Sequence, residues 1–274
     1  MTLSKLNFTQ KPLVMGIVNV TPDSFSDGGS FYNKNNAIEH GLKLLEEGAD
    51  ILDIGGESTR PGAEAVDIEE EILRVVPVVS GLKQKAKWIS IDSRNAKTIE
   101  AALEAGANII NDVSALTHDS ESINVALRYD VPVILMHSKG LPADMQNNPQ
   151  YNNVLDEVYD YLSERISSCM AAGIEKSRII VDPGIGFGKS LEHNLIILKN
   201  LDHFKGLGCP ILLGASRKSF ISMIMKGAGV EQRLGGSIAS VLIGAQKGAS
   251  IVRVHDVYDS VQALQTYYAI EDGV

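Results

Sequence analysis

Two short apolar runs, Val131-Pro-Val-Ile-Leu135 and Arg178-Ile-Ile-Val181, decide how this chain folds. Neither run alternates apolar with polar residues, and strands of this kind are buried on both faces, as in a parallel sheet. Comparable runs recur along the chain and predict eight strands: Leu13–Val18, Ile51–Ile54, Trp88–Ile91, Asn108–Ile110, Val131–Met136, Arg178–Val181, Ile211–Leu213 and Ile251–Val252. Segments of helical periodicity lie between them, near residues 35–48, 68–85, 95–105, 120–129, 151–172, 190–200, 217–247 and 256–270.

Eight strand–helix units in a chain of 274 residues match a (β/α)8 TIM barrel with its active site at the C-terminal ends of the strands. No linker, low-complexity tract or fixed repeat interrupts the chain, so residues 1–274 are predicted to form a single domain. A doubly wound sheet is the alternative, and it would carry G-x-G-x-x-G after the first strand. The chain has Gly-Ile-Val-Asn-Val-Thr-Pro at residues 16–22 instead, which favours the barrel.

Composition and charge exclude several classes of protein. The chain has 25 Lys and Arg against 34 Asp and Glu, a net charge of −9, which argues against a nucleic-acid-binding surface. It contains no apolar stretch of membrane-spanning length and no signal-peptide pattern at its N-terminus, so we expect a cytoplasmic protein without a membrane partner. The two cysteines, Cys169 and Cys209, are too few for a disulfide framework and are predicted to be buried thiols.

Polar residues follow almost every predicted strand directly: Asn19, Glu57-Ser-Thr-Arg60, Asp92, Asn111-Asp112, His137, Asp182, Ser216-Arg-Lys218 and Arg253-Val-His255. A single polar residue in such a place is usually a turn or a helix cap. In a barrel, however, all these strand ends converge on one face, where the active sites of this fold lie. A set that combines cations, a histidine, carboxylates and amides therefore favours an active site over a collection of caps.

Eight segments of the chain resemble the dihydropteroate synthase family. They are MGIVNVTPDSFSDGG (Met15–Gly29), DIGGESTRPG (Asp53–Gly62), SIDS (Ser90–Ser93), IINDVSA (Ile109–Ala115), LMH (Leu135–His137), DPGIGFGKS (Asp182–Ser190), GASRKSF (Gly214–Phe220) and RVHDV (Arg253–Val257). The resemblance implies a TIM-barrel transferase of folate biosynthesis. Such an enzyme joins 6-hydroxymethyl-7,8-dihydropterin diphosphate to p-aminobenzoate, releases pyrophosphate and is a target of sulfonamides.

A pterin presents a flat edge of amide and amino groups, which calls for an acidic acceptor, an amide and a cationic donor. Asp182, Asn111 and Lys218 each stand at a strand end and supply that set, although Asp182 alone could be a turn residue before Pro183. By the resemblance, Asp92 faces the pterin ring nitrogens, where its charge could stabilise positive charge on the pterin methylene carbon. These four are the predicted catalytic residues, and the resemblance adds Gly214 and Phe187 to the pterin site.

The diphosphate needs cations and N–H donors. Arg253 and His255 follow the last strand, where barrels often bind phosphate, and Thr59 and Arg60 are expected to meet the same region from the second loop. By the resemblance, Asn19 is the ligand of a Mg²⁺ ion that bridges phosphate oxygens. His137 is expected to be structural.

The p-aminobenzoate site is taken from the resemblance. Phe187 and Lys189 are expected to line it, with Lys218, Ser219 and Pro61 nearby. The loop Thr21–Tyr32 is either a surface Ω-loop or, as the resemblance implies, a lid in which Phe25 and Asp27 take part.

Three alternatives can be compared on sequence alone. The run Gly184-Ile-Gly-Phe-Gly-Lys-Ser190 misses the P-loop spacing by one residue, so it does not indicate a nucleotide site. A pterin-binding methyltransferase with a corrinoid partner would not need the Ser216–Phe220 and Arg253–His255 segments. A non-catalytic pterin-binding barrel would be expected to lose Lys218, Arg253 or Asn19. We therefore predict a synthase that uses a dissociative displacement without a covalent nucleophile, and the resemblance implies a homodimer.

Overall fold

The computed structural model describes residues 6, 8, 11–21, 30–57, 66–140 and 149–273. Eight strands alternate with helices along these residues. The strands are β1 (Leu13–Asn19), β2 (Ile51–Gly55), β3 (Ile89–Asp92), β4 (Ile109–Asp112), β5 (Val133–Met136), β6 (Ile179–Asp182), β7 (Leu212–Leu213) and β8 (Ile251–Val254). Each runs within a residue or two of its predicted range.

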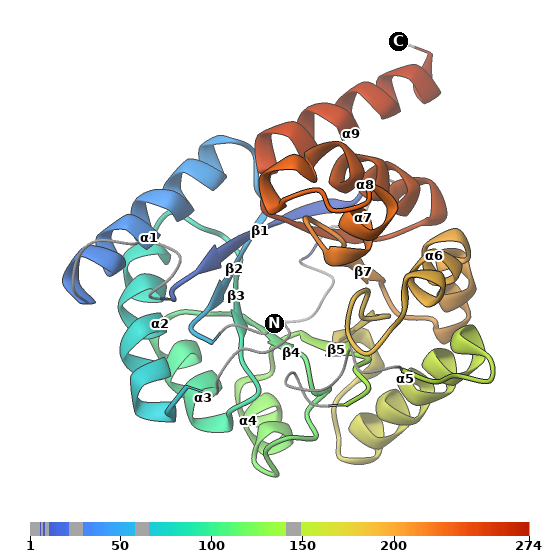
Figure 1. Ribbon diagram of the computed structural model, residues 1–274. Coiled ribbons are helices and arrows are strands. Elements are labelled where there is room, and N and C mark those ends of the chain that lie inside the picture. The colour runs from blue at the N-terminus through green and yellow to red at the C-terminus, as the bar shows by residue number, and fades with distance from the viewer. Residues whose placement is uncertain are drawn as a thin grey trace.

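The helices form a ring around the strands (Figure 1). They are α1 (Ser30–Glu46), α2 (Ile68–Leu82), α3 (Ala96–Ala105), α4 (Ser122–Tyr129), α5 (Val154–Ala171), α6 (Leu191–Lys199), α7 (Ser219–Ile224), α8 (Leu234–Lys247) and α9 (Val257–Asp272). Short 3₁₀ turns lie at Lys176–Arg178, Leu201–Leu207 and Val230–Gln232. No helix in the described part of the chain is long and apolar enough to cross a membrane.

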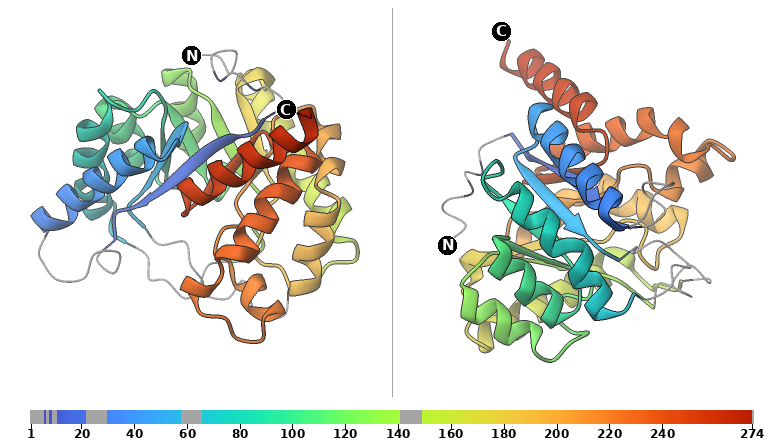
Figure 2. Two further views of the ribbon diagram at one scale, coloured as in Figure 1. Left: turned by 90° about the horizontal axis from the view of Figure 1, so that it is seen from above. Right: turned by 90° about the vertical axis from the view of Figure 1, so that its left-hand side faces the viewer.

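The strands pair in parallel in the order β6-β5-β4-β3-β2-β1-β8-β7. A parallel bridge between Val181 and Ile211 joins β6 to β7 and completes the circle. The predicted TIM barrel is therefore confirmed, and the doubly wound alternative is wrong. Two perpendicular views show α1 and α9 lying against opposite sides of β1, on the outside of the barrel (Figure 2).

Two apolar layers hold the barrel together. The larger fills the space between strands and helices, where side chains such as Leu52, Ile110 and Leu162 are fully buried. The smaller layer fills the inside of the barrel. Each strand, or the residue directly before it in the case of Trp88, contributes one side chain: Met15, Ile51, Trp88, Ile109, Ile134, Ile180, Leu212 and Ile251. Leu6 packs against this layer. The inside of the barrel is thus filled by apolar side chains near the N-terminal ends of the strands. A ligand site inside the barrel can therefore lie only toward the C-terminal ends.

The segment of helical periodicity predicted near residues 217–247 is not a single helix. The segment contains α7, a 3₁₀ turn and α8, and the first break follows Ile224. There Lys226 and Gly227 have φ of 52° and 115°, the left-handed region in which a right-handed helix cannot continue. Helical periodicity survives such a break because the apolar spacing resumes on its far side.

Candidate active site

The alternation of side chains along each strand places a polar layer directly above the inner apolar layer. Residues two positions beyond the apolar members face the same way, into the barrel. This rule selects Asp53 after Ile51, Asn111 after Ile109 and Asp182 after Ile180. It also selects Ser90, Gly214 and Arg253, while Asp92 and His255 lie one further step up. The predicted site residues on β3, β4, β6 and β8 therefore meet Asp53 of β2 in the mouth of the barrel.

Arg253 is the centre of this layer. Its Nε donates to Asp53 Oδ2 at 2.6 Å and its Nη2 donates to Asp92 Oδ2 at 2.7 Å. Burial disfavours the charged guanidinium, but the two carboxylates outweigh burial and raise the pKa of Arg253. The sequence predicts Arg253 as a diphosphate ligand together with His255. The structure adds two carboxylate partners to this arginine, whose side chain keeps 20% of its surface exposed.

Asp92 is nine-tenths buried beside that guanidinium. Burial raises the pKa of Asp92 to about 7, Arg253 opposes the rise and the charge of Asp53 adds to it. A carboxylate held in this way ionises readily once a ligand brings further donors or positive charge.

Asp182 and Lys218 form the second half of the layer. The Oδ1 atom of Asp182 accepts the N–H of Gly184 at 2.7 Å, and burial raises the pKa of this carboxyl while Lys218 lowers it. The Nζ of Lys218 donates to the carbonyl of Ile185 and lies 4.3 Å from the centre of the Phe187 ring. Burial lowers the pKa of Lys218 to about 8, against the attraction of Asp182. Because burial disfavours the charged form of each group, a ligand that pairs with these charged forms would stabilise both of them.

The glycine-rich loop after β6 is a structural turn that presents Phe187. Gly184 has φ of +70°, and a Cβ there would lie 1.9 Å from the carbonyl oxygen of His137, so only glycine fits. Lys189 lies inside this loop with 1% exposure. Its Nζ lies 2.8 Å from His137 Nδ1 and donates to the carbonyls of Gly184 and Phe187 at 2.9 and 3.0 Å.

The burial of Lys189 corrects its expected place along the p-aminobenzoate site. The side chain that seemed available to a ligand instead supports the turn from within. His137, expected to be structural, is its partner, and burial followed by the charge of Lys189 lowers the pKa of His137 to about 2. The ring is therefore neutral, and its Nδ1 can accept a hydrogen bond from Lys189 Nζ, whose own pKa is lowered by burial.

The remaining predicted residues occupy the rim. Asn19 ends β1 and is half-buried, and Ser219 begins α7. His255 lies against Ser216, whose Oγ is 3.1 Å from His255 Nδ1 and accepts its backbone N–H at 3.2 Å. Gly214 lies between Asp182 and Arg253, and a Cβ there would be 3.8 Å from Asp182 Oδ2. Five predicted residues lie outside the described residues: Phe25, Asp27, Thr59, Arg60 and Pro61.

Asp53 is a site residue that the strand-end pattern of the sequence does not predict. Its signal is a charged residue in the middle of the buried strand Ile-Leu-Asp-Ile-Gly, at an inward position. Within the described ranges no group of three or more His, Cys, Asp or Glu side chains could hold a metal ion. Asn19 carries a side-chain oxygen of the kind that Mg²⁺ accepts as a ligand.

The fold and this layer of acids, amides and cations define an enzyme that binds a flat, polar heterocycle. The chain matches the family model described as "Pterin binding enzyme" over residues 15–255, and it belongs to that family. It is 46% identical over 259 residues to the dihydropteroate synthase of Haemophilus influenzae, with 94% of each chain covered.

Solved structures give the same result. The Xanthomonas albilineans dihydropteroate synthase with 4-aminobenzoic acid has a TM-score of 0.90 and 48% identity, covering 95% of this chain and 93% of that one. The Yersinia pestis dihydropteroate synthase in a sulfonamide drug complex has a TM-score of 0.90 and 42% identity, covering 96% and 95%. Within the pterin-binding enzymes, the chain therefore belongs with the dihydropteroate synthases, which are transferases.

Proposed function

We propose that this chain condenses 6-hydroxymethyl-7,8-dihydropterin diphosphate with p-aminobenzoate to give 7,8-dihydropteroate and pyrophosphate. The observation that carries the proposal is the inward polar layer, which joins Asp182 and Lys218 on one side to Asn111 and Asp92 on the other. In this arrangement Asp182 accepts the pterin amino and ring N–H donors, and Lys218 donates to the ring carbonyl. Asn111 both donates and accepts along the same edge.

The reaction breaks the bond between the pterin methylene carbon and the diphosphate oxygen and forms a bond from that carbon to the amine nitrogen. The amine then releases a proton to water. Asp92, in its ionised form, stabilises positive charge on the pterin as the leaving group departs, so the displacement is dissociative. No covalent nucleophile is required, because pyrophosphate is a good leaving group once its charge is matched.

Residues on the rim of the site would neutralise the negative charge of the diphosphate leaving group. We assign this role to Arg253 and His255 and, from their positions in the sequence alone, to Thr59 and Arg60, which lie outside the described residues. Asn19 would hold a Mg²⁺ ion, which neutralises phosphate charge when it is bound. We place p-aminobenzoate against Phe187, Lys218 and Ser219, where a sulfonamide would compete with it, in line with the drug complex of the Yersinia pestis relative.

One assay tests the reaction. Purified protein with both substrates and Mg²⁺ should release pyrophosphate and form dihydropteroate in equal amounts, and neither product should form when p-aminobenzoate is left out. Pterin binding without pyrophosphate release would instead identify a non-catalytic pterin-binding barrel. Transfer of a methyl group would identify a methyltransferase. Both substrates are charged biosynthetic metabolites, so we place the reaction in the cytoplasm.

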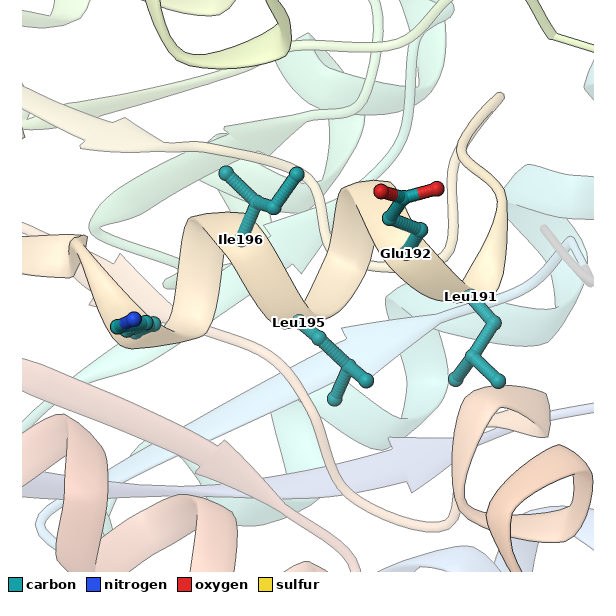
Figure 3. Close-up of a pocket in the computed structure, with 5 residues that line it drawn as sticks. Leu191, Glu192, Leu195 and Ile196 are labelled. Carbon is teal, nitrogen blue, oxygen red and sulfur yellow. The ribbon is translucent and has the colours of Figure 1, made fainter.

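We further propose that the enzyme is a homodimer that pairs through its C-terminal helices. A surface pocket on α6 is lined by Leu191, Leu195, Ile196 and the stems of Glu192 and Lys199 (Figure 3). The neighbouring α7 and α8 expose further large apolar side chains: Met223, Ile224, Leu234 and Ile243. Exposed apolar area of this kind favours a protein contact. Sedimentation should give twice the chain mass, and Leu195→Glu should shift the equilibrium to monomer. A monomeric wild-type protein at micromolar concentration would overturn this arrangement.

A further inference from the structure

Asp53 is a fully buried carboxylate in the middle of β2, and it touches two of the predicted ligand-binding side chains. Its 0% exposure means that it cannot reach a ligand itself. Its hydrogen bonds cross the barrel in both directions, to Arg253 on β8 and to Asn111 on β4. In the order of the sheet these strands lie two places from β2 on either side.

The contact with Arg253 anchors the root of the guanidinium. Asp53 Oδ2 accepts a hydrogen bond from Arg253 Nε at 2.6 Å, and Asp92 Oδ2 accepts one from Nη2 at 2.7 Å. The two bonds together hold the guanidinium in one orientation. A carboxylate on Nε leaves the Nη1 edge of the fork for an anion. Without it, the long arginine side chain would sample other rotamers, which costs binding energy when the anion arrives.

The contact with Asn111 decides which way its carboxamide points. The same oxygen, Asp53 Oδ2, accepts from Asn111 Nδ2 at 3.1 Å. Because a carboxylate only accepts, it excludes the flipped amide in which oxygen would face oxygen. The carbonyl oxygen of Asn111 and its second N–H are then left for the pterin edge.

We propose that Asp53 is the positioning residue of this site: one buried oxygen orients both the cation that meets the diphosphate and the amide that reads the pterin. The inference rests on the proposed function, since Asp53 acts on the same site. The other oxygen, Oδ1, is buried without a hydrogen-bond partner among the described residues. A buried polar atom of this kind is unfavourable for folding, so this carboxylate is not one that stability alone would select.

The test variant is Asp53→Asn, which keeps the size and removes the charge. The matched control is Glu71→Gln. Glu71 is also fully buried and also accepts two hydrogen bonds on one oxygen, from Asn95 at 2.8 Å and Thr98 at 2.6 Å. Its second oxygen likewise has no partner in the described part of the chain. The difference is location, because Glu71 joins α2 to the start of α3 on the outside of the barrel.

We expect Asp53→Asn to lower kcat/KM for the pterin diphosphate by roughly 10- to 100-fold, the range typical when the hydrogen-bond partner of a metal-binding residue is removed. Affinities for 6-hydroxymethylpterin and for Mg²⁺-pyrophosphate, measured separately by calorimetry, should both weaken. The KM for p-aminobenzoate should not change. Glu71→Gln should change thermal stability and leave both affinities unchanged, because Glu71 contacts neither Arg253 nor Asn111 and its charge is the smallest of the causes that raise the pKa of Asp92. In an Arg253→Ala background, Asp53→Asn should cause no further loss of pyrophosphate affinity, because the effect passes through Arg253.

Equal kcat/KM in Asp53→Asn and Glu71→Gln would overturn the inference, and so would additive losses in the double variant. If Asp53→Asn does not fold, Asp53→Glu replaces it, since it keeps the charge but moves the oxygens by one methylene, and the same selective loss is expected. The proposed function fails separately, if the wild-type protein makes no dihydropteroate. The pyrophosphate titration still decides the role of Asp53 in that case.

Discussion

Asp182→Asn should abolish most pterin binding without harming the fold, and the structure gives the reason in atomic terms. The N–H of Gly184, 2.7 Å from Asp182 Oδ1, can only donate. An asparagine must therefore turn its amide oxygen toward Gly184. Its NH₂ group then replaces Oδ2 on the side of Gly214 and faces the pterin donors. One charge-assisted bond is lost and two donors are set against each other.

The magnitude follows from these two changes. Together they should cost about 2–4 kcal/mol of binding, or roughly 30- to 700-fold in affinity for 6-hydroxymethylpterin. Burial raises the pKa of Asp182, so its charge is unfavourable in the ligand-free protein and the neutral variant should unfold at the same temperature or higher. Calorimetric titration checks the affinity, and Mg²⁺-pyrophosphate binding, unchanged within about twofold, is the internal control. Unaltered pterin affinity would refute the assignment of Asp182 as the acceptor.

Three further predictions concern stability. Gly184→Ala should lower the free energy of unfolding by at least about 3 kcal/mol, because the added Cβ clashes with the His137 carbonyl and the backbone is left-handed. Gly227→Ala, also at positive φ but with open space around it, should lower it less, and urea unfolding of the two variants makes the comparison. Lys189→Met should destabilise the protein by about 3–5 kcal/mol, since it leaves buried acceptors of the glycine loop unpaired, and a melting temperature equal to the wild type would contradict that role. The free energy of unfolding of the ligand-free enzyme should fall as pH rises from about 4 to 7, because burial raises the pKa of Asp92 to about 7 and the folded state then holds a proton that the unfolded chain has released. Urea midpoints measured across this pH range should decline less in Asp92→Asn than in the wild type.

The sequence alone was sufficient for the barrel and for much of the polar layer. Apolar runs such as Arg178–Val181 are local features, and a strand buried on both faces must be apolar wherever it lies in the sheet. The polar residue after each run, Asp182 for example, needed only the rule that parallel strands end on one face. Both inferences depend on neighbours along the chain, which the sequence displays directly.

The break in the predicted helix over 217–247 shows where local reasoning stops. Apolar periodicity does not register one left-handed residue, and Gly227 also suits a helix interior with a small loss. Lys189 shows the same limit for burial. A lysine after a glycine-rich run is typical of an exposed ligand site, and only the packed loop supplies the carbonyls that keep its ammonium inside.

The orientation of Arg253 was decided by the tertiary structure alone. Its partner Asp53 lies 200 residues away, and Asp92 lies 161 residues away. The sequence determined that these residues stand at or near the ends of strands on one face. Which charges meet there depends on side-chain direction across the closed barrel, where the short distances between buried groups make one pairing far stronger than any other. For this protein, local periodicity and strand-end chemistry determined the fold and the kinds of groups in the site, and the closure of the barrel decided their partners.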